Sequence, residues 1–214
     1  ATSGAITLND STIALSGTAS DLVTGLDGLT GFSGAVTLTD DPSYTGAVTL
    51  TDDPSLALAQ LVTINTATSG AITFNDDSVA LSGSSSDVAA ALDGTTYTGA
   101  VTLTDDPSLA QLVTINTATS GAITLNDSTI ALSGTASDLV TGLDGLTGFS
   151  GAVTLDDTTL AAATLNTLDS STTGTVDATT VTTLTGSAAN VNTAYAAGAT
   201  GTITNLGDET VTLS

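Results

Sequence analysis

The feature that most limits how this chain can fold is a long internal repeat. The segment Ala1–Leu38 recurs without a change as Ala118–Leu155, and a diverged copy occupies Ala67–Leu103. A second phrase, AQLVTINTATSGAIT, is found at Ala59–Thr73 and again at Ala110–Thr124, so its two copies begin 51 residues apart. A fixed period of this kind indicates repeated supersecondary units, each of which buries its apolar side against the next unit.

Each period divides into two halves that share a strand-like phrase. One half begins SGAVTLTDDPS and the other SGAITLNDSTI, and in both the apolar residues alternate with polar ones. An apolar stretch with helical spacing follows each phrase. Its members are Leu109, Leu112, Val113 and Asn116 in the first half and Leu139, Val140 and Leu143 in the second. Halves of about 22 and 29 residues have the size of a single solenoid turn.

We therefore expect a repeat solenoid, in which short strands form a parallel β-sheet stack and are joined by short helical turns. This is an α/β-solenoid or a β-solenoid, and the alternative is an all-β solenoid without helices. Regular repeats are expected over residues 1–155 and a degenerate terminal repeat or cap over 156–214. An irregularity is expected near residues 39–55, because the phrase GAVTLTDDPS starts at Gly34 and again at Gly46, only 12 residues later.

Residues typical of helix ends flank both helical stretches. Asp106-Pro107 predicts an N-cap followed by proline in the first turn, and Ser137-Asp138 predicts a similar start for the second helix. Gly121 and Gly145 lie just beyond the two stretches, where a left-handed residue commonly ends a helix.

The charge balance excludes several classes of function. The 214 residues contain 22 acidic side chains and no Lys, Arg, His or Cys, so the formal charge is −22. Nucleic acids and anionic membrane surfaces need Lys or Arg for binding, so neither is expected as a partner. Without His, Lys or Cys the chain also has no ordinary base or thiol nucleophile, and we expect that it is not an enzyme. No apolar run is long enough to insert into a membrane.

Paired aspartates follow the strand phrase and are the candidate metal ligands. The pairs are Asp40 and Asp41, Asp52 and Asp53, Asp105 and Asp106, and Asp156 and Asp157. Stacked repeats would bring like charges close together, and calcium, which prefers carboxylate and carbonyl oxygens, would relieve the repulsion. Alternatively, one Asp of each pair caps the next helix and the other is solvated. No other cofactor is expected.

Two asparagines recur late in the first helical stretch, at Asn65 and Asn116. We expect them to form stacked side-chain ladders or to satisfy backbone groups at the turn, and a role as ligands is the alternative.

The phrases (V/I)TLTDDPSLAQLVTINTATSG and ALSGTASDLVTGL resemble the Thr-, Asp- and Ala-rich repeats of giant bacterial cell-surface proteins, especially those of cyanobacteria. The resemblance implies secretion and a role in adhesion, surface coats, filaments or cell-surface motility, with calcium bound in some members. We therefore expect an extracellular or cell-surface structural segment that self-associates end to end into a filament, fibre or surface layer. The alternative is an adhesin or a calcium-dependent binding module that uses Thr-rich strand faces.

Overall fold

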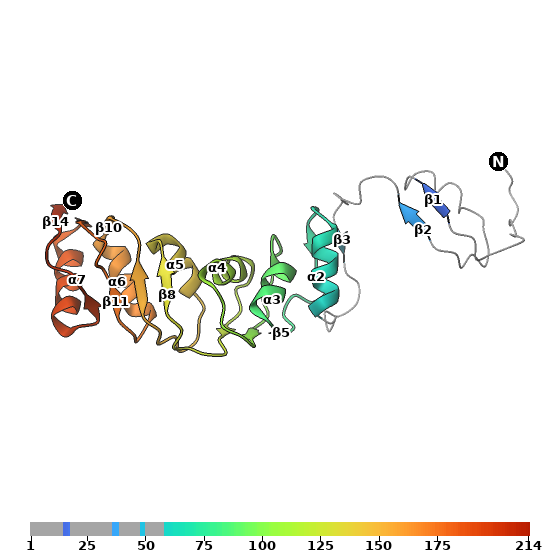
Figure 1. Ribbon diagram of the computed structural model, residues 1–214, viewed down its shortest axis with the longest axis horizontal. Helices are drawn as coiled ribbons and strands as arrows, with labels where there is room; N and C mark the ends of the chain where they lie inside the picture. The colour runs from blue at the N-terminus through green and yellow to red at the C-terminus, as the bar shows by residue number, and fades with distance from the viewer. Residues whose placement is uncertain (1–14, 18–35, 39–47, 50–57) are drawn as a thin grey trace, which may run out of the picture. The chain divides into compact units, whose positions relative to one another are not determined.

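The computed structural model describes residues 15–17, 36–38, 48–49 and 58–214, and these form an α/β fold of helices and parallel strands (Figure 1). The six helices of the described residues are α2 (Leu58–Ala67), α3 (Ser85–Leu92), α4 (Leu109–Ala118), α5 (Ala136–Leu143), α6 (Ala162–Ser171) and α7 (Ala188–Thr200). The strands are β1 (Leu15–Gly17), β2 (Val36–Leu38), β3 (Val48–Thr49), β4 (Ile72–Thr73), β5 (Leu81–Gly83), β6 (Val101–Leu103), β7 (Ile123–Thr124), β8 (Leu132–Gly134), β9 (Val153–Leu155), β10 (Thr159–Ala161), β11 (Val176–Asp177), β12 (Thr183–Gly186), β13 (Ile203–Thr204) and β14 (Thr210–Leu213).

The chain divides into two compact units. The first consists of Ala1–Gly46 with Ala67–Gly70, and its described part contains the parallel pair β1–β2, in which Leu15 lies opposite Val36. The second consists of Ala47–Thr66 with Ala71–Ser214 and contains all the other strands.

Strand pairing in the second unit is parallel throughout the described residues. β6 pairs with β5 and β7, β9 pairs with β8 and β11, and β12 pairs with β10 and β14. The chain passes through one helix between each pair of partners. For example, Leu132 pairs with Val153 across α5, and Val153 pairs with Val176 across α6. Parallel partners need such a crossover, because two strands joined by a tight turn would be antiparallel.

The predicted combination of short parallel strands and short helices is therefore confirmed, and the all-β alternative is wrong. Helices α3 and α5 have eight residues each, whereas α2, α4 and α6 have ten. This alternation of helix length follows the 51-residue period of the sequence. The predicted irregularity near residues 39–55 lies outside the described residues, apart from β3, which pairs with β4.

The core consists of aliphatic columns that run across the paired strands. Val101 and Leu103 are buried on β6 while Thr102 between them is exposed, as the alternating phrase predicts. The buried face of α4 differs from the predicted one. On α4 the buried residues are Leu112, Ile115 and Ala118, while the predicted Leu109, Val113 and Asn116 are only partly covered. Burying a side chain such as Leu112 contributes roughly 1.5–3 kcal/mol.

Leu109 is only partly covered because its side chain packs against the next helix, α5, at the edge of the core. Its Cδ1 lies 2.8 Å from the position that a Cβ on Gly142 of α5 would occupy. Gly142 is buried, so the missing side chain leaves room for Leu109. On α5 itself Leu139 and Leu143 are buried as predicted, and Val140 is half-buried.

Both predicted helix starts are wrong by about two residues. Helix α4 begins after Ser108, whose Oγ accepts a hydrogen bond from the Gln111 N–H, and the Gln111 side chain accepts from the Ser108 N–H at 2.8 Å. This reciprocal capping box uses both orphan donors, so Pro107 lies before the helix rather than in its first turn. Helix α5 begins after Thr135, whose Oγ1 accepts from the Asp138 N–H.

The two glycines predicted to end helices have different roles. Gly145 has φ of +69°, so the predicted left-handed residue after α5 is confirmed. Gly121 is not left-handed, and α4 ends in the extended residue Thr119. Gly121 instead lies against the preceding repeat, where a Cβ would overlap the carbonyl oxygen of Gly99. The Gly of the strand phrase is thus required by close backbone approach.

Deletion of residues 67–117 should leave a cooperatively folded chain. The cut joins Thr66 to Ala118 within the phrase shared by α2 and α4, so α2 takes the place of α4 beside α5. Deletion of residues 97–118, which removes β6 and α4 and so one half of the double unit, should abolish cooperative unfolding, because the two eight-residue helices α3 and α5 then become neighbours. Thermal unfolding followed by circular dichroism measures both. Equal cooperativity in the two deletions would contradict the 51-residue double unit.

Candidate functional site

The described Asp pairs are placed where consecutive repeats meet, and one carboxylate of each pair caps a helix. Asp105 Oδ1 accepts a hydrogen bond of 2.6 Å from the N–H of Ser85, the first residue of α3. Asp157 Oδ2 accepts one of 2.6 Å from the N–H of Ala136, the first residue of α5. Carboxylates suit this position because the helix N-terminus carries unpaired N–H groups and partial positive charge.

The expected direction of capping is wrong. The sequence suggests that each Asp caps the helix that follows it, whereas Asp105 and Asp157 cap helices that lie 20 and 21 residues before them in the chain. The helices that follow are capped differently. Ser108 caps α4, and α6 begins after Ala161 without a side-chain hydrogen bond at its cap.

The second members of the two pairs, Asp106 and Asp156, are exposed. In the part of the chain that the structure describes, no group of three or more acidic side chains gathers in a way that could hold a metal ion. Asp40, Asp41, Asp52 and Asp53 lie outside the described residues. Calcium binding at the eight paired aspartates therefore stays a prediction.

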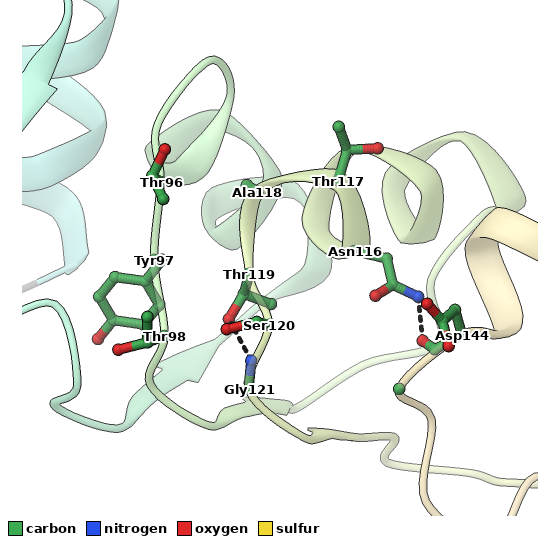
Figure 2. A pocket seen from close by; sticks show the side chains of 11 residues that line it. Thr96, Tyr97, Thr98, Asn116, Thr117, Ala118, Thr119, Ser120, Gly121 and Asp144 are labelled. Carbon is green, nitrogen blue, oxygen red and sulfur yellow. Dashed lines mark hydrogen bonds between the residues drawn. The ribbon is translucent and has the colours of Figure 1, made fainter.

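The predicted role of the two asparagines in satisfying backbone groups is confirmed. The Nδ2 of Asn65 donates to the carbonyls of Ala90 and Asp93 at 2.8 and 3.0 Å, at the end of α3. The Nδ2 of Asn116 donates to the carbonyl of Thr141 at 2.7 Å and to that of Asp144 at the end of α5. Figure 2 shows the bond to Asp144. Lys or Arg commonly interacts with these last carbonyls, and in a chain without either the neutral amide supplies the donor.

The degenerate C-terminal repeat keeps this contact in altered form. The Nδ2 of Asn166 donates to the Asn190 carbonyl at 3.0 Å, which lies in the first turn of α7 rather than at its end. The Oδ1 of Asn166 and the Oδ1 of Asp169 are buried without a hydrogen-bond partner. The repeat thus retains the amide but not the full set of acceptors that Asn116 has.

A groove of about 470 Å³ lies beside the ends of α4 and α5 and the segment before β6 (Figure 2). Thr96, Thr117, Ser120 and Asp144 present exposed polar groups to it. The groove therefore offers hydroxyl groups, one carboxylate and helix-end carbonyls. These groups can hydrogen-bond a neutral polar molecule.

Other groups around the groove serve the fold. Tyr97 is 1% exposed, its hydroxyl donates to the Val79 carbonyl, and its ring packs edge-on against Phe74 with centroids 5.5 Å apart. Its face is therefore not available for stacking on a sugar. The buried Thr119 hydroxyl donates to the Gly99 carbonyl and accepts from the Gly121 N–H, both at 3.0 Å.

Local hydrogen bonds stabilise the ionised form of three aspartates at equivalent turns. The hydroxyl of Thr129 lowers the pKa of Asp127 below the usual 3.8, and the Thr129 N–H adds to the effect. Ser78 acts in the same way on the pKa of Asp76, and Thr179 with Asn205 on that of Asp177. Because folding lowers these pKa values, the stabilisation is present above about pH 3.8 and is lost as the pH falls through the folded-state values.

Comparison of the chain with protein families, with curated proteins and with solved structures finds no match in any of the three. Among the described residues, no helix is both long and apolar enough to cross a bilayer.

Replacing Asn116 with Ala should lower the free energy of unfolding by about 1–3 kcal/mol, because two carbonyls at the end of α5 lose their donor. The matched control is Asn126→Ala, since Asn126 is exposed and outside this contact, and its effect should stay within about 0.5 kcal/mol. Urea unfolding measures both. Equal effects of the two substitutions would contradict a capping role for Asn116.

Asp105→Ala should lower the unfolding free energy by about 1 kcal/mol, because the first N–H of α3 loses its acceptor. Asp106→Ala, at the exposed neighbour, should change it little. Repeating the two measurements with calcium and with a chelator separates the two roles of the pair. If calcium stabilises the wild type and either substitution removes that gain, the pair acts as a calcium ligand rather than as a cap.

Proposed function

We propose that this chain is a solenoid segment that serves as a structural subunit of an extracellular filament, fibre or surface layer. The parallel pairing between consecutive repeats carries the proposal. Val153, for example, pairs with Leu132 of the preceding repeat and with Val176 of the following one, so strand β9 has a partner on both sides, as β6, β11 and β12 also do. Such a stack can be extended by adding repeats without redesigning the core.

Capping across repeats supports the same proposal. The eight-residue helix α5 depends on Asp157 from the following repeat at its start and on Asn116 from the preceding repeat at its end. A helix of this length is marginal by itself in water. Repeats that complete one another in this way favour a cooperative array whose function depends on its shape.

The composition favours a role outside the cell. Without Lys or Arg the chain has no cleavage site for trypsin-like proteases, and its 22 carboxylates keep the surface hydrated. The resemblance of its repeats to those of bacterial surface proteins points the same way. Self-association with like copies is the partner that we propose, and we assign no catalytic role to the groove beside α4 and α5.

The second candidate is an adhesin or calcium-dependent binding module, and it rests on rows of hydroxyl groups. Ser82, Thr102 and Thr124 lie in register across β5, β6 and β7, and all three are exposed. The row continues to Thr147, whose hydroxyl lies 3.5 Å from that of Thr124. Hydroxyl groups repeating at the strand spacing of about 4.8 Å form a regular polar face suited to a neutral ligand.

Electron microscopy of the chain, with calcium and with a chelator, tests the structural role. We expect narrow rods or filaments of constant width whose length increases with protein concentration. Survival of the filaments in chelator supports assembly through strand pairing alone, and their dissolution supports calcium at the Asp pairs. Compact monomeric particles under all conditions would contradict the structural role and leave the binding module as the better candidate.

A further inference from the structure

The groove beside the ends of α4 and α5 contains polar groups that the fold does not use. The hydroxyls of Thr96 and Ser120 and the carboxylate of Asp144 line it, are exposed, and make no hydrogen bond within the described part of the chain. Asn116 also lines the groove, and its Oδ1 accepts no hydrogen bond there although its Nδ2 donates two. The groove therefore offers two hydroxyl donors and two kinds of acceptor oxygen to a bound molecule.

Hydrogen bonds of the fold hold these groups in place. The two bonds from its Nδ2 to the end of α5 fix the orientation of the Asn116 amide. The Ser120 N–H donates to the Tyr97 carbonyl at 3.0 Å, and the Tyr97 N–H donates to the Ala118 carbonyl at 2.8 Å. Figure 2 shows Asn116 on α4, Ser120 in the segment after it and Asp144 at the end of α5. Groups that are fixed before binding lose little conformational entropy when a ligand arrives.

Asp144 lies where a negative charge is unfavourable for the fold. It is the C-cap residue of α5, and Asp93 is the C-cap residue of α3. The C-terminal end of a helix carries partial negative charge, so a carboxylate there costs stability. Neither side chain makes a hydrogen bond in the described part of the chain that would offset this cost. A charge that opposes the fold is typical of a residue kept for binding.

The same groups recur one period earlier in the chain. The set Asn65, Thr66 and Asp93 lies 51 residues before the set Asn116, Thr117 and Asp144. Asn65 also bonds two carbonyls at the end of the helix beside it, at 2.8 and 3.0 Å. A ligand that follows the repeats can therefore meet the same groups more than once, which favours a polymer of repeated units.

The charge of the chain selects the class of ligand. With 22 acidic side chains and no Lys, Arg or His, the chain repels anions. Carboxylate and amide oxygens accept hydrogen bonds from the hydroxyl groups of a sugar, and Ser and Thr hydroxyls donate to its oxygens. The groove volume of about 470 Å³ lies within the range of about 300–1,000 Å³ that is typical of small-molecule sites.

We propose that this groove is a carbohydrate-binding site for a neutral polysaccharide. Hydroxyl groups of the sugar donate to the Asp144 carboxylate and the Asn116 Oδ1, and its oxygens accept from Ser120 and Thr96. The site goes beyond the hydroxyl row on β5, β6 and β7, because it uses none of the residues of that row. It lies within the second unit of a single chain, so binding does not depend on the formation of filaments.

Native electrophoresis in gels that contain a polysaccharide tests the proposal. The neutral probes are dextran, mannan and xyloglucan, and polygalacturonate is the acidic comparison. We expect at least one neutral probe to retard the chain, equally with calcium and with a chelator, and polygalacturonate to leave its mobility unchanged. Failure of all three neutral probes, retardation by polygalacturonate, or binding that needs calcium would each overturn direct recognition of a neutral sugar.

A double substitution separates binding from stability. Asp93→Asn with Asp144→Asn should weaken binding to the retarding polysaccharide by about tenfold or more, because each site loses a charge-assisted hydrogen bond. The melting temperature should stay the same or rise, because the C-cap charges are removed. Asp87→Asn with Asp208→Asn changes the net charge equally at exposed residues outside the groove and should leave binding unchanged. Equal binding by the two double variants would count decisively against the site.

Ser120→Ala is a second test that leaves the charge unchanged. It should weaken binding by about threefold to tenfold, because one hydroxyl donor is lost. Its control is Ser86→Ala, at an exposed residue of α3 outside the groove, which should bind like the wild type. Binding that persists in a chain without filaments would refute the structural function alone, and filaments that form in a chain without binding would refute this site alone.

Discussion

The contact between consecutive repeats is the interaction on which the rest of this structure depends. It supplies more than apolar burial, because the short helices obtain their end groups from it. α3 receives Asp105 at its start and Asn65 at its end, and α5 receives Asp157 and Asn116 at the same positions. The ten-residue helix α4 carries its own capping box through Ser108 and Gln111. The short helices α3 and α5 therefore combine their own N-caps, Ser84 and Thr135, with end groups from neighbouring repeats, whereas α4 starts from its own capping box.

The contact between repeats also separates the features that could be predicted from the sequence from those that could not. Alternation in the strand phrase predicts Val101 and Leu103 inside and Thr102 outside, and the left-handed Gly145 follows from its place after an apolar stretch. These features are local, so their signal lies within a few residues. The capping partners of Asp105 and Asp157 lie 20 and 21 residues away, and nothing local distinguishes the helix before an Asp from the helix after it. The recurrence of Asn65 and Asn116 did indicate a role in backbone bonding, but which helix they serve depends on the stacking itself.

A chain with 22 carboxylates and no base must place its negative charges without ion pairs. The described part of this chain does so by giving many carboxylates a backbone or hydroxyl donor. Asp127 and Asp177 bond the hydroxyl and N–H two residues ahead, and Asp105 and Asp157 bond helix N-termini of the neighbouring repeat. Hydrogen bonds to the ionised form favour that form, so the charge is compatible with a close-packed array. Whole chains still repel one another. This repulsion becomes weaker as the ionic strength rises, and any assembly of this protein has to overcome it.

In the C-terminal part of the described chain, helix α7 has end groups of its own. It has 13 residues, an N-cap from Ser187 and a left-handed Gly201 at its end. In the sheet, β14 continues the parallel register of β10 and β12. Helix ends can be completed by local residues, because one or two side chains replace the missing donors and acceptors.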